Sequence, residues 1–202
     1  MCSRFELDHT FEAVVLRFNI TAKAQFESNF QSIKEVRPTD QMPVITNNNR
    51  VVYLSWGLKV DWNKNPIINA RSETLTQKST FQTMLKNRCL VPATAYYEWR
   101  KENNIKVKTR IHSQDQKLIS FAGLFDENYF TIITCKPSPS ISNIHDRMPV
   151  ILNQTDETAW ISEDNSFDKV AKFLRPSQDT SLRSEEILKP LNTTNTQGDL
   201  FD

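Results

Sequence analysis

The chain has 202 residues, and its 25 Lys and Arg residues nearly balance its 24 Asp and Glu residues, leaving a net charge of +1. This length fits one compact domain with a core and a cleft. A hydrophobic fraction of 38% and a charged fraction of 24% argue against wholesale disorder. Because the chain has no global positive charge, DNA binding would require a local basic patch.

The composition also limits compartment and cofactors. The segment Met1 to Glu6 lacks the apolar core of a signal peptide, and no apolar run approaches the roughly 18 residues that span a bilayer. We therefore expect a cytoplasmic protein without a membrane segment. Cys2, Cys89 and Cys135 have no metal-ligand spacing, so we expect no zinc site, disulfide framework or cofactor. The apolar runs around Cys89 and Cys135 are typical of a core.

The first half of the chain gives uneven signals. Residues 11–18 mix apolar and charged residues without clean alternation, and residues 21–30 fit a short helix or an irregular segment. Val51 to Gly57 is rich in β-branched and aromatic residues, which predicts a strand ending at Gly57. Ser72 to Leu85 combines a Ser or Thr start with spaced apolar residues, which predicts a helix.

The middle of the chain predicts a β-meander. Five runs have strand character, at 89–92, 96–99, 105–112, 118–125 and 129–135. Helical spacing follows at 156–161 and 167–174, and Pro176 marks an end. We therefore predict a single α+β domain with a mainly antiparallel, curled or barrel-like β core and flanking helices. Residues 1–176 form the domain proper, and the polar segment 177–202 is part of it or partly flexible.

Cys2 carries the clearest chemistry. Removal of Met1 would leave a free α-amine beside the thiol, and these groups have reference pKa values of about 8 and 8.5. The amine can form a Schiff base with an aldehyde, and the thiolate can then close a five-membered thiazolidine ring. The ring-opened sugar of an abasic site offers such an aldehyde. A cysteine at position 2 can also be coincidental, so the neighbouring motifs must decide.

Four segments together resemble the SOS-response-associated peptidase family of abasic-site-processing proteins. They are Cys2-Ser3-Arg4-Phe5, Ile68 to Thr74, Arg88 to Ala93 running into Tyr97-Glu98-Trp99, and Ile144 to Val150. The connecting runs 121–125 and 131–134 also resemble that family, so the likeness covers roughly three quarters of the chain in order. It implies the fold of that family and capture of abasic sites in single-stranded DNA through Cys2.

The resemblance implies three further catalytic residues. Asn69 would hydrogen-bond near the α-amine or the captured sugar, because a carboxamide offers donors and acceptors without charge. Glu98 would act as a general acid or base, with a pKa raised among aromatic rings. His145 would transfer protons to the ring oxygen or the Schiff base. A turn-forming Asn, a surface Glu and a structural His are the ordinary alternatives.

The resemblance also implies a DNA-binding set. Arg4, Arg71 and Arg147 would contact phosphates and Trp62 would stack on bases, while Pro38 and Thr134 would line the cleft. Ion pairs with Glu73 or Asp146 are the alternative for Arg71 and Arg147. We expect Lys106, Lys108 and Arg110 to form a solvated strand face.

Three positions depart from the family pattern. Ser3 stands where the family usually has Gly, Asp61-Trp62-Asn63 shortens a loop that usually carries two tryptophans, and Ala95 replaces another usual Gly. Ser3 places a side chain beside the nucleophile, and the shorter Trp62 loop puts the strength of base stacking in doubt. Because Ala95 stands in place of a glycine, the backbone conformation near Glu98 can differ from that of the family.

Alternative functions remain open at this point. Cys2 and His145 could serve a cysteine-type peptidase, or the chain could be a non-catalytic single-stranded DNA-binding module. Met1 could be removed autocatalytically or by an aminopeptidase, and lyase activity could accompany capture. The C-terminal Gln197, Leu200 and Phe201 resemble a peptide that docks on the replication sliding clamp. We expect a monomer.

Overall fold

Two β-systems meet at the start of the chain in the computed structural model, which describes residues 2–21, 27, 29–103, 105–177 and 181–187. The first is a five-stranded sheet in the order β14-β10-β9-β1-β2. Its strands are β1 (Arg4–Leu7), β2 (Ile33–Val36), β9 (Ala95–Glu102), β10 (Ile105–Ser113) and β14 (Leu182–Glu186). Every pairing in this sheet is antiparallel, and β9 and β10 form a long hairpin.

The second system is barrel-like. Its strands are β3 (Gln41–Thr46), β4 (Arg50–Trp56), β7 (Asn69–Arg71), β8 (Arg88–Ala93), β11 (Ile119–Phe125), β12 (Tyr129–Cys135) and β13 (Met148–Pro149). The order β11-β8-β3-β4-β12 closes on itself because β11 also pairs with β12. Only the pairings of β12 with β4 and β7 are parallel in the described part of this sheet. The predicted mainly antiparallel, barrel-like core is confirmed.

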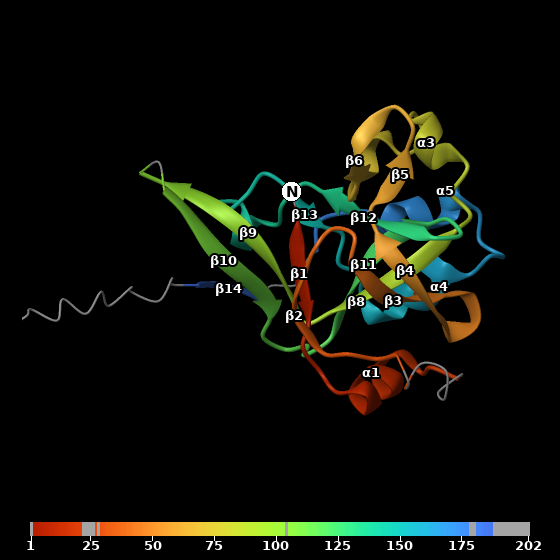
Figure 1. The fold of residues 1–202 in the computed structure, drawn as a ribbon, viewed down its shortest axis with the longest axis horizontal. Helices are drawn as coiled ribbons and strands as arrows, with labels where there is room; N and C mark the ends of the chain where they lie inside the picture. The colour runs from red at the N-terminus through yellow and green to blue at the C-terminus, as the bar shows by residue number, and fades with distance from the viewer. Residues whose placement is uncertain (1, 22–26, 28, 104, 178–180, 188–202) are drawn as a thin grey trace, which may run out of the picture.

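The remaining elements lie around these sheets. A separate two-stranded unit pairs β5 (Leu58–Val60) with β6 (Asn63–Ile67). The helices are α1 (Phe11–Phe18), α3 (Ser79–Gln82), α4 (Gln154–Ile161) and α5 (Phe167–Val170), with 3₁₀ turns at 47–49, 72–74, 139–141 and 171–173. Figure 1 shows β1 between the β9–β10 hairpin and the barrel-like system. The chain therefore starts at the junction of the two sheets.

Aromatic packing holds this junction together. The Phe5 ring of β1 is fully buried and lies edge-on to Trp56 of β4 at 5.0 Å and to Phe121 of β11 at 6.0 Å. Tyr96 of β9 packs edge-on against the same Phe121 at 6.0 Å. Such aromatic pairs stabilise by about 0.5–1.5 kcal/mol beyond the area they bury. The first strand is thus fixed against both sheets just after Cys2.

Two segments differ from the sequence reading. Residues 11–18, which showed no clean pattern, form α1, because Thr10 caps the helix by accepting from the Ala13 N–H at 3.3 Å and Asn19 ends it in the left-handed conformation. The predicted continuous helix from Ser72 to Leu85 is wrong. A 3₁₀ turn at 72–74 and the short α3 replace it, because Lys78 is extended and Ser and Thr side chains compete for the backbone.

The C-terminal segment contributes to the first sheet. Strand β14 pairs with β10 from Leu182 to Glu186, so these residues belong to the same sheet as β1. The proposed clamp-docking residues Gln197, Leu200 and Phe201 lie outside the described residues. Much of the segment 21–30 also falls outside them.

Replacement of Phe5 tests the role of the sheet junction. Phe5→Ala should lower the free energy of unfolding by about 3–5 kcal/mol, because it removes a buried ring and leaves a cavity. Phe11→Ala, a half-buried ring on α1, should cost clearly less. Urea denaturation of both variants checks this, and equal losses would contradict the central position of Phe5.

Candidate functional site

Cys2 lies at the junction, just before β1 begins. It is fully buried, and its carbonyl oxygen accepts a hydrogen bond of 2.7 Å from Nδ2 of Asn69 on β7. Its thiol donates to the carbonyl of Arg4 at 3.5 Å. Because β1 belongs to one sheet and β7 to the other, the Asn69 bond connects the two systems two residues before the first strand begins.

The thiol of Cys2 is protonated in this environment. Burial raises its pKa well above the usual value, and the negative charge of Glu98 raises it further. A thiol in this state is a weak nucleophile, because the thiolate is the reactive form. Direct attack by a preformed thiolate is therefore disfavoured here.

Glu98 faces the same region from β9. Its side chain is 2% exposed, and burial raises its pKa to about 7. The strand places Tyr96 and Glu98 on one side, since alternate residues share a face. A carboxyl group with a pKa near neutrality can both donate and accept a proton at physiological pH.

His145 approaches Glu98 from the loop before β13. Its Nε2 lies 3.7 Å from Oε2 of Glu98, and its Nδ1 accepts the Arg147 N–H at 3.1 Å. Nδ1 also lies 2.7 Å from the Asp146 carboxylate, which would require a proton on the same nitrogen. Burial lowers the His145 pKa, which favours the neutral ring near pH 7, and in the tautomer that accepts the Arg147 N–H the proton is on Nε2, toward Glu98.

Two pockets adjoin these residues. We call the first the Glu98 pocket; its volume is about 440 Å³, and it is lined by Ser3, Arg4, Glu98, Trp99, Lys101, Lys106 and His145. The second, the Trp62 pocket, measures about 690 Å³ and is lined by Trp62, Ile67, Asn69, Arg71, Thr74, Lys78, Ser79, Thr80 and Phe81. Asn69 lines the second pocket while holding Cys2, so Cys2 is adjacent to both.

The Trp62 pocket contains three of the predicted site residues. Asn69 and Arg71 are alternate residues of β7, separated by the buried Ala70, so their side chains share a face. Trp62 lies between β5 and β6 with 70% of its surface exposed. Arg71 has no acidic partner within 4 Å among the described residues, which leaves its guanidinium available to an anion.

The other predicted DNA contacts are placed differently. Arg147 makes a bidentate ion pair with Glu73 at 2.7 and 3.0 Å, and it also donates to the Thr134 carbonyl at 2.6 Å. Arg147 is therefore engaged in an ion pair, the alternative to a free DNA-binding side chain, and its partner is Glu73 rather than the neighbouring Asp146. Thr134 is fully buried beneath it, and Pro38 lies half-buried in the turn after β2.

Arg4 lines the Glu98 pocket but is partly neutralised. Its Nη1 donates to the Ser3 carbonyl at 2.6 Å, and its Nε lies 3.4 Å from Glu35. Glu35 also pairs with Lys108, while Arg110 pairs with Glu6 and Glu185. The expected solvated face of Lys106, Lys108 and Arg110 is thus wrong for the latter two, because acidic residues of β1, β2 and β14 meet them.

The sequence reading missed three residues of the Glu98 pocket, Trp99, Lys101 and Lys106. Alternation along β9 and β10 could have placed them on one face. It could not show that they line one pocket with Glu98 and His145, because alternation puts the Glu98 side chain on the opposite face of β9.

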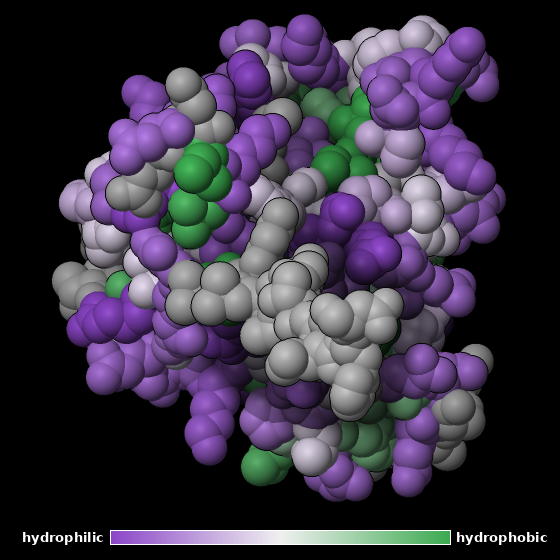
Figure 2. Space-filling view, turned by 60° about the vertical axis from the view of Figure 1, so that its left-hand side comes forward, coloured by the Kyte–Doolittle hydropathy of each residue, from purple (hydrophilic) through white to green (hydrophobic). Residues whose placement is uncertain are grey.

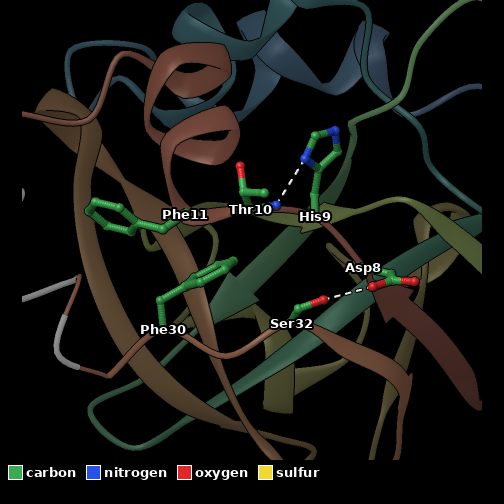
Figure 3. A pocket seen from close by; sticks show the side chains of 6 residues that line it. All are labelled: Asp8, His9, Thr10, Phe11, Phe30 and Ser32. Carbon is green, nitrogen blue, oxygen red and sulfur yellow. Dashed lines mark hydrogen bonds between the residues drawn. The ribbon is translucent and has the colours of Figure 1, made fainter.

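A third pocket brings a serine, a histidine and an aspartate close together without forming a catalytic triad. It lies beyond the other end of β1, measures about 520 Å³ and is lined by Asp8, His9, Thr10, Phe11, Phe30 and Ser32 (Figure 3). Ser32 donates to Asp8 at 2.7 Å, whereas His9 accepts the Thr10 N–H at 2.9 Å and points away from that pair. The Ser, His and Asp side chains therefore do not form the relay of a serine hydrolase.

Comparisons with known proteins identify the class. A family model described as SOS response associated peptidase (SRAP) matches residues 1–194, so the chain belongs to this family. It is 33% identical to the abasic site processing protein YoqW of Bacillus subtilis, over 96% of this chain and 95% of that one. It is 25% identical to the abasic site processing protein YedK of Escherichia coli, over 82% of each.

The fold agrees with that assignment. The crystal structure of a protein from Bacteroides thetaiotaomicron superposes with a TM-score of 0.82 at 26% identity, over 93% of both chains. Within the described ranges, no helix is both long and apolar enough to cross a membrane. No cluster of three or more His, Cys, Asp and Glu side chains in that part of the chain could hold a metal ion.

The buried carboxyl group makes stability depend on pH. The pKa of Glu98 rises from 4.5 unfolded to about 7 folded, so its protonated form stabilises the fold below pH 4.5 and this stabilisation is lost as the pH rises through 7. Glu98→Gln should therefore gain stability relative to wild type between pH 5 and 8, on the order of 3 kcal/mol. Urea denaturation at several pH values measures this difference.

The exposed Glu127 supplies the matched control. Glu127→Gln should show a stability difference from wild type that does not change over the same pH range. A pH-independent difference for Glu98→Gln would contradict the raised pKa.

Proposed function

We propose that this protein senses abasic sites in single-stranded DNA and captures them covalently through Cys2 after Met1 is removed. The relatives named as abasic site processing proteins support the substrate. The observation that carries the proposal is the position of Cys2. Asn69 holds it near Glu98, which His145 contacts, and its neighbours Asn69 and Ser3 line two pockets that contain cationic side chains.

The proposed reaction needs no cofactor. The free α-amine of Cys2 adds to the sugar aldehyde, and loss of one water gives an imine. The thiol then adds to the imine carbon, forming a C–S bond, and its proton passes to the nitrogen. The product is a thiazolidine that joins protein to DNA, and no oxidant or reductant is required.

This order of steps fits the protonated thiol. The amine attacks first, and the thiol becomes reactive only when a base takes its proton next to the imine. Glu98 can serve as that base because its pKa lies near neutrality. His145, with its proton on Nε2, can protonate the departing ring oxygen or hydroxyl group.

Asn69 is proposed to orient the amine. Its Nδ2 donates to the Cys2 carbonyl, whereas its Oδ1 is buried and has no hydrogen-bond partner among the residues that the structure describes. A buried carbonyl oxygen without a donor costs about 1–3 kcal/mol, so a donor supplied by the processed N-terminus or the sugar would be stabilised there. Asn69 would thus act as a positioning residue at the reacting nitrogen.

The DNA strand is proposed to contact Arg71 and Trp62 on one side and Arg4 on the other. Arg71 offers its fork to a phosphate, and the exposed Trp62 ring offers a stacking surface. Arg147 would bind DNA only if a phosphate replaced Glu73 or used its remaining Nη1 donor. Pro38 would line the cleft next to these groups, whereas the fully buried Thr134 would act only by holding Arg147 through its carbonyl and hydroxyl oxygens.

A peptidase acting in trans is less well supported. Its thiol would have to be ionised by a neighbouring histidine, whereas the Cys2 thiol is buried and donates to a backbone carbonyl. Removal of Met1 by the protein itself and strand cleavage by lyase action remain proposals for the same groups. Mass spectrometry of protein from cells lacking methionine aminopeptidase activity would test the former.

Mixing Met1-processed protein with single-stranded DNA that carries one abasic site tests the capture chemistry. Denaturing gels and intact-mass spectrometry should show a heat-resistant adduct for wild type. Cys2→Ala should form none, and Cys89→Ala should retain capture if it folds, because that thiol lies in the core. An adduct in Cys2→Ala, or none in processed wild type, would contradict the proposal.

The acid-base role of Glu98 has its own test. Glu98→Gln should slow adduct formation by about 10²- to 10⁴-fold, the usual contribution of general acid-base catalysis, and should remove the rate dependence near pH 7. Single-turnover rates between pH 5.5 and 8.5 measure both effects. A variant with wild-type rate and pH profile would exclude Glu98 from proton transfer.

A further inference from the structure

We propose that Lys101, Lys106 and Trp99 form a subsite for the nucleotide that flanks the abasic sugar, with its phosphate on the two lysines and its base against Trp99. This proposal rests on the proposed function and extends it to a second side of the DNA strand. All three residues line the Glu98 pocket together with His145. Its volume of about 440 Å³ lies within the range of small-molecule sites.

The hairpin register places these side chains on one face. Lys106 of β10 lies directly opposite Lys101 of β9, and the next pair on that face is Lys108 opposite Trp99. Directly opposite residues have Cβ atoms about 4.5–5.5 Å apart and project to the same side. The two ammonium groups can therefore approach one phosphate together, with the Trp99 ring beside them.

Charge sets Lys101 and Lys106 apart from their neighbours. Lys108 and Arg110, farther along the same face, each have acidic partners. Lys101 and Lys106 have none within 4 Å among the described residues. Like charges directly opposite each other destabilise a sheet. This arrangement is unfavourable for the isolated fold, and a bound phosphate anion would offset it.

The surroundings favour an extended anionic ligand. Figure 2, turned so that the hairpin side of Figure 1 comes forward, shows that the coloured side chains visible on this side are mostly hydrophilic, with separate hydrophobic groups among them. Trp99 is half-buried in the pocket wall, so one part of its ring is accessible to a base. Single-stranded DNA alternates phosphates with bases, so one nucleotide can place its phosphate on the lysines and its base against the Trp99 ring.

The subsite also gives the strand a direction across the site. The Trp62 pocket is lined by Asn69, which is hydrogen-bonded to Cys2. The Glu98 pocket is lined by Ser3 and Arg4, which follow Cys2 in the chain. A strand that places its abasic sugar at Cys2 would thus have one flanking nucleotide at Trp62 and Arg71. The nucleotide on the other side would reach Trp99, Lys101 and Lys106.

The salt dependence of DNA binding tests the phosphate contacts. In a Cys2→Ala background, which prevents crosslinking, the double variant Lys101→Gln/Lys106→Gln should bind single-stranded DNA more weakly. The slope of log K against log salt should fall by about 0.7, the contribution of one lost single-strand phosphate contact, because both lysines bind the same phosphate. Lys117→Gln, an exposed lysine beyond the opposite end of β10, should leave the slope unchanged.

Thermal denaturation separates binding from folding. Because the variant removes a like-charge pair, its melting temperature at low salt should equal or exceed that of the parent protein. A lower melting temperature together with an unchanged salt slope would mean that the lysines only support the hairpin, and would overturn the proposal.

Capture rates on shortened DNA test the position of the subsite. Removing the nucleotides on one side of the abasic site should slow adduct formation by wild type, and the lysine variant should be insensitive to removal on that same side. Equal sensitivity in both proteins would overturn the subsite. If wild type forms no adduct at all, the proposed function fails, while the salt slope still decides whether the lysines bind phosphate.

Discussion

The hydrogen bond between the Cys2 carbonyl and Asn69 is the contact on which the site depends. It joins Cys2, two residues before β1, to β7, and so crosses from the five-stranded sheet to the barrel-like system. The buried contacts of Phe5 with Trp56 and Phe121 fix the same junction three residues later in the chain. A reactive N-terminal residue would otherwise be at the end of a chain, where backbone freedom is greatest. Here its main chain is held from both sides.

Burial then determines the chemistry at this junction. It raises the pKa of the Cys2 thiol and of Glu98, and it lowers the pKa of His145. The three shifts favour the neutral form of each group, but at pH 7 Glu98 is still divided between its neutral and charged forms, so its carboxylate can take the proton of the thiol without creating an additional charge. Positive charge is kept at the periphery, on Arg71 in one pocket and on Arg4, Lys101 and Lys106 in the other. A near-neutral chain can thus offer a cationic path to DNA.

Local patterns predicted much of this structure. The strands around Glu98 and the meander that follows show in alternation and β-branched content, and the motifs around Cys2, Asn69 and His145 indicated residues that the fold brings together. The segment from 72 to 85 was misread because apolar spacing looked helical, whereas its Ser and Thr side chains and the extended Lys78 interrupt the helix. Long-range pairings were beyond the sequence: Glu73 meets Arg147 only because β7 and β12 lie side by side.

The most direct test of covalent capture is tandem mass spectrometry of the N-terminal peptide from the DNA adduct, after alkylation of free thiols. The account predicts that the sugar remnant is on Cys2 of a chain lacking Met1, with both amine and sulfur blocked, so that this thiol resists alkylation. A remnant on a lysine, or on Cys2 through nitrogen alone with an alkylated thiol, would contradict it.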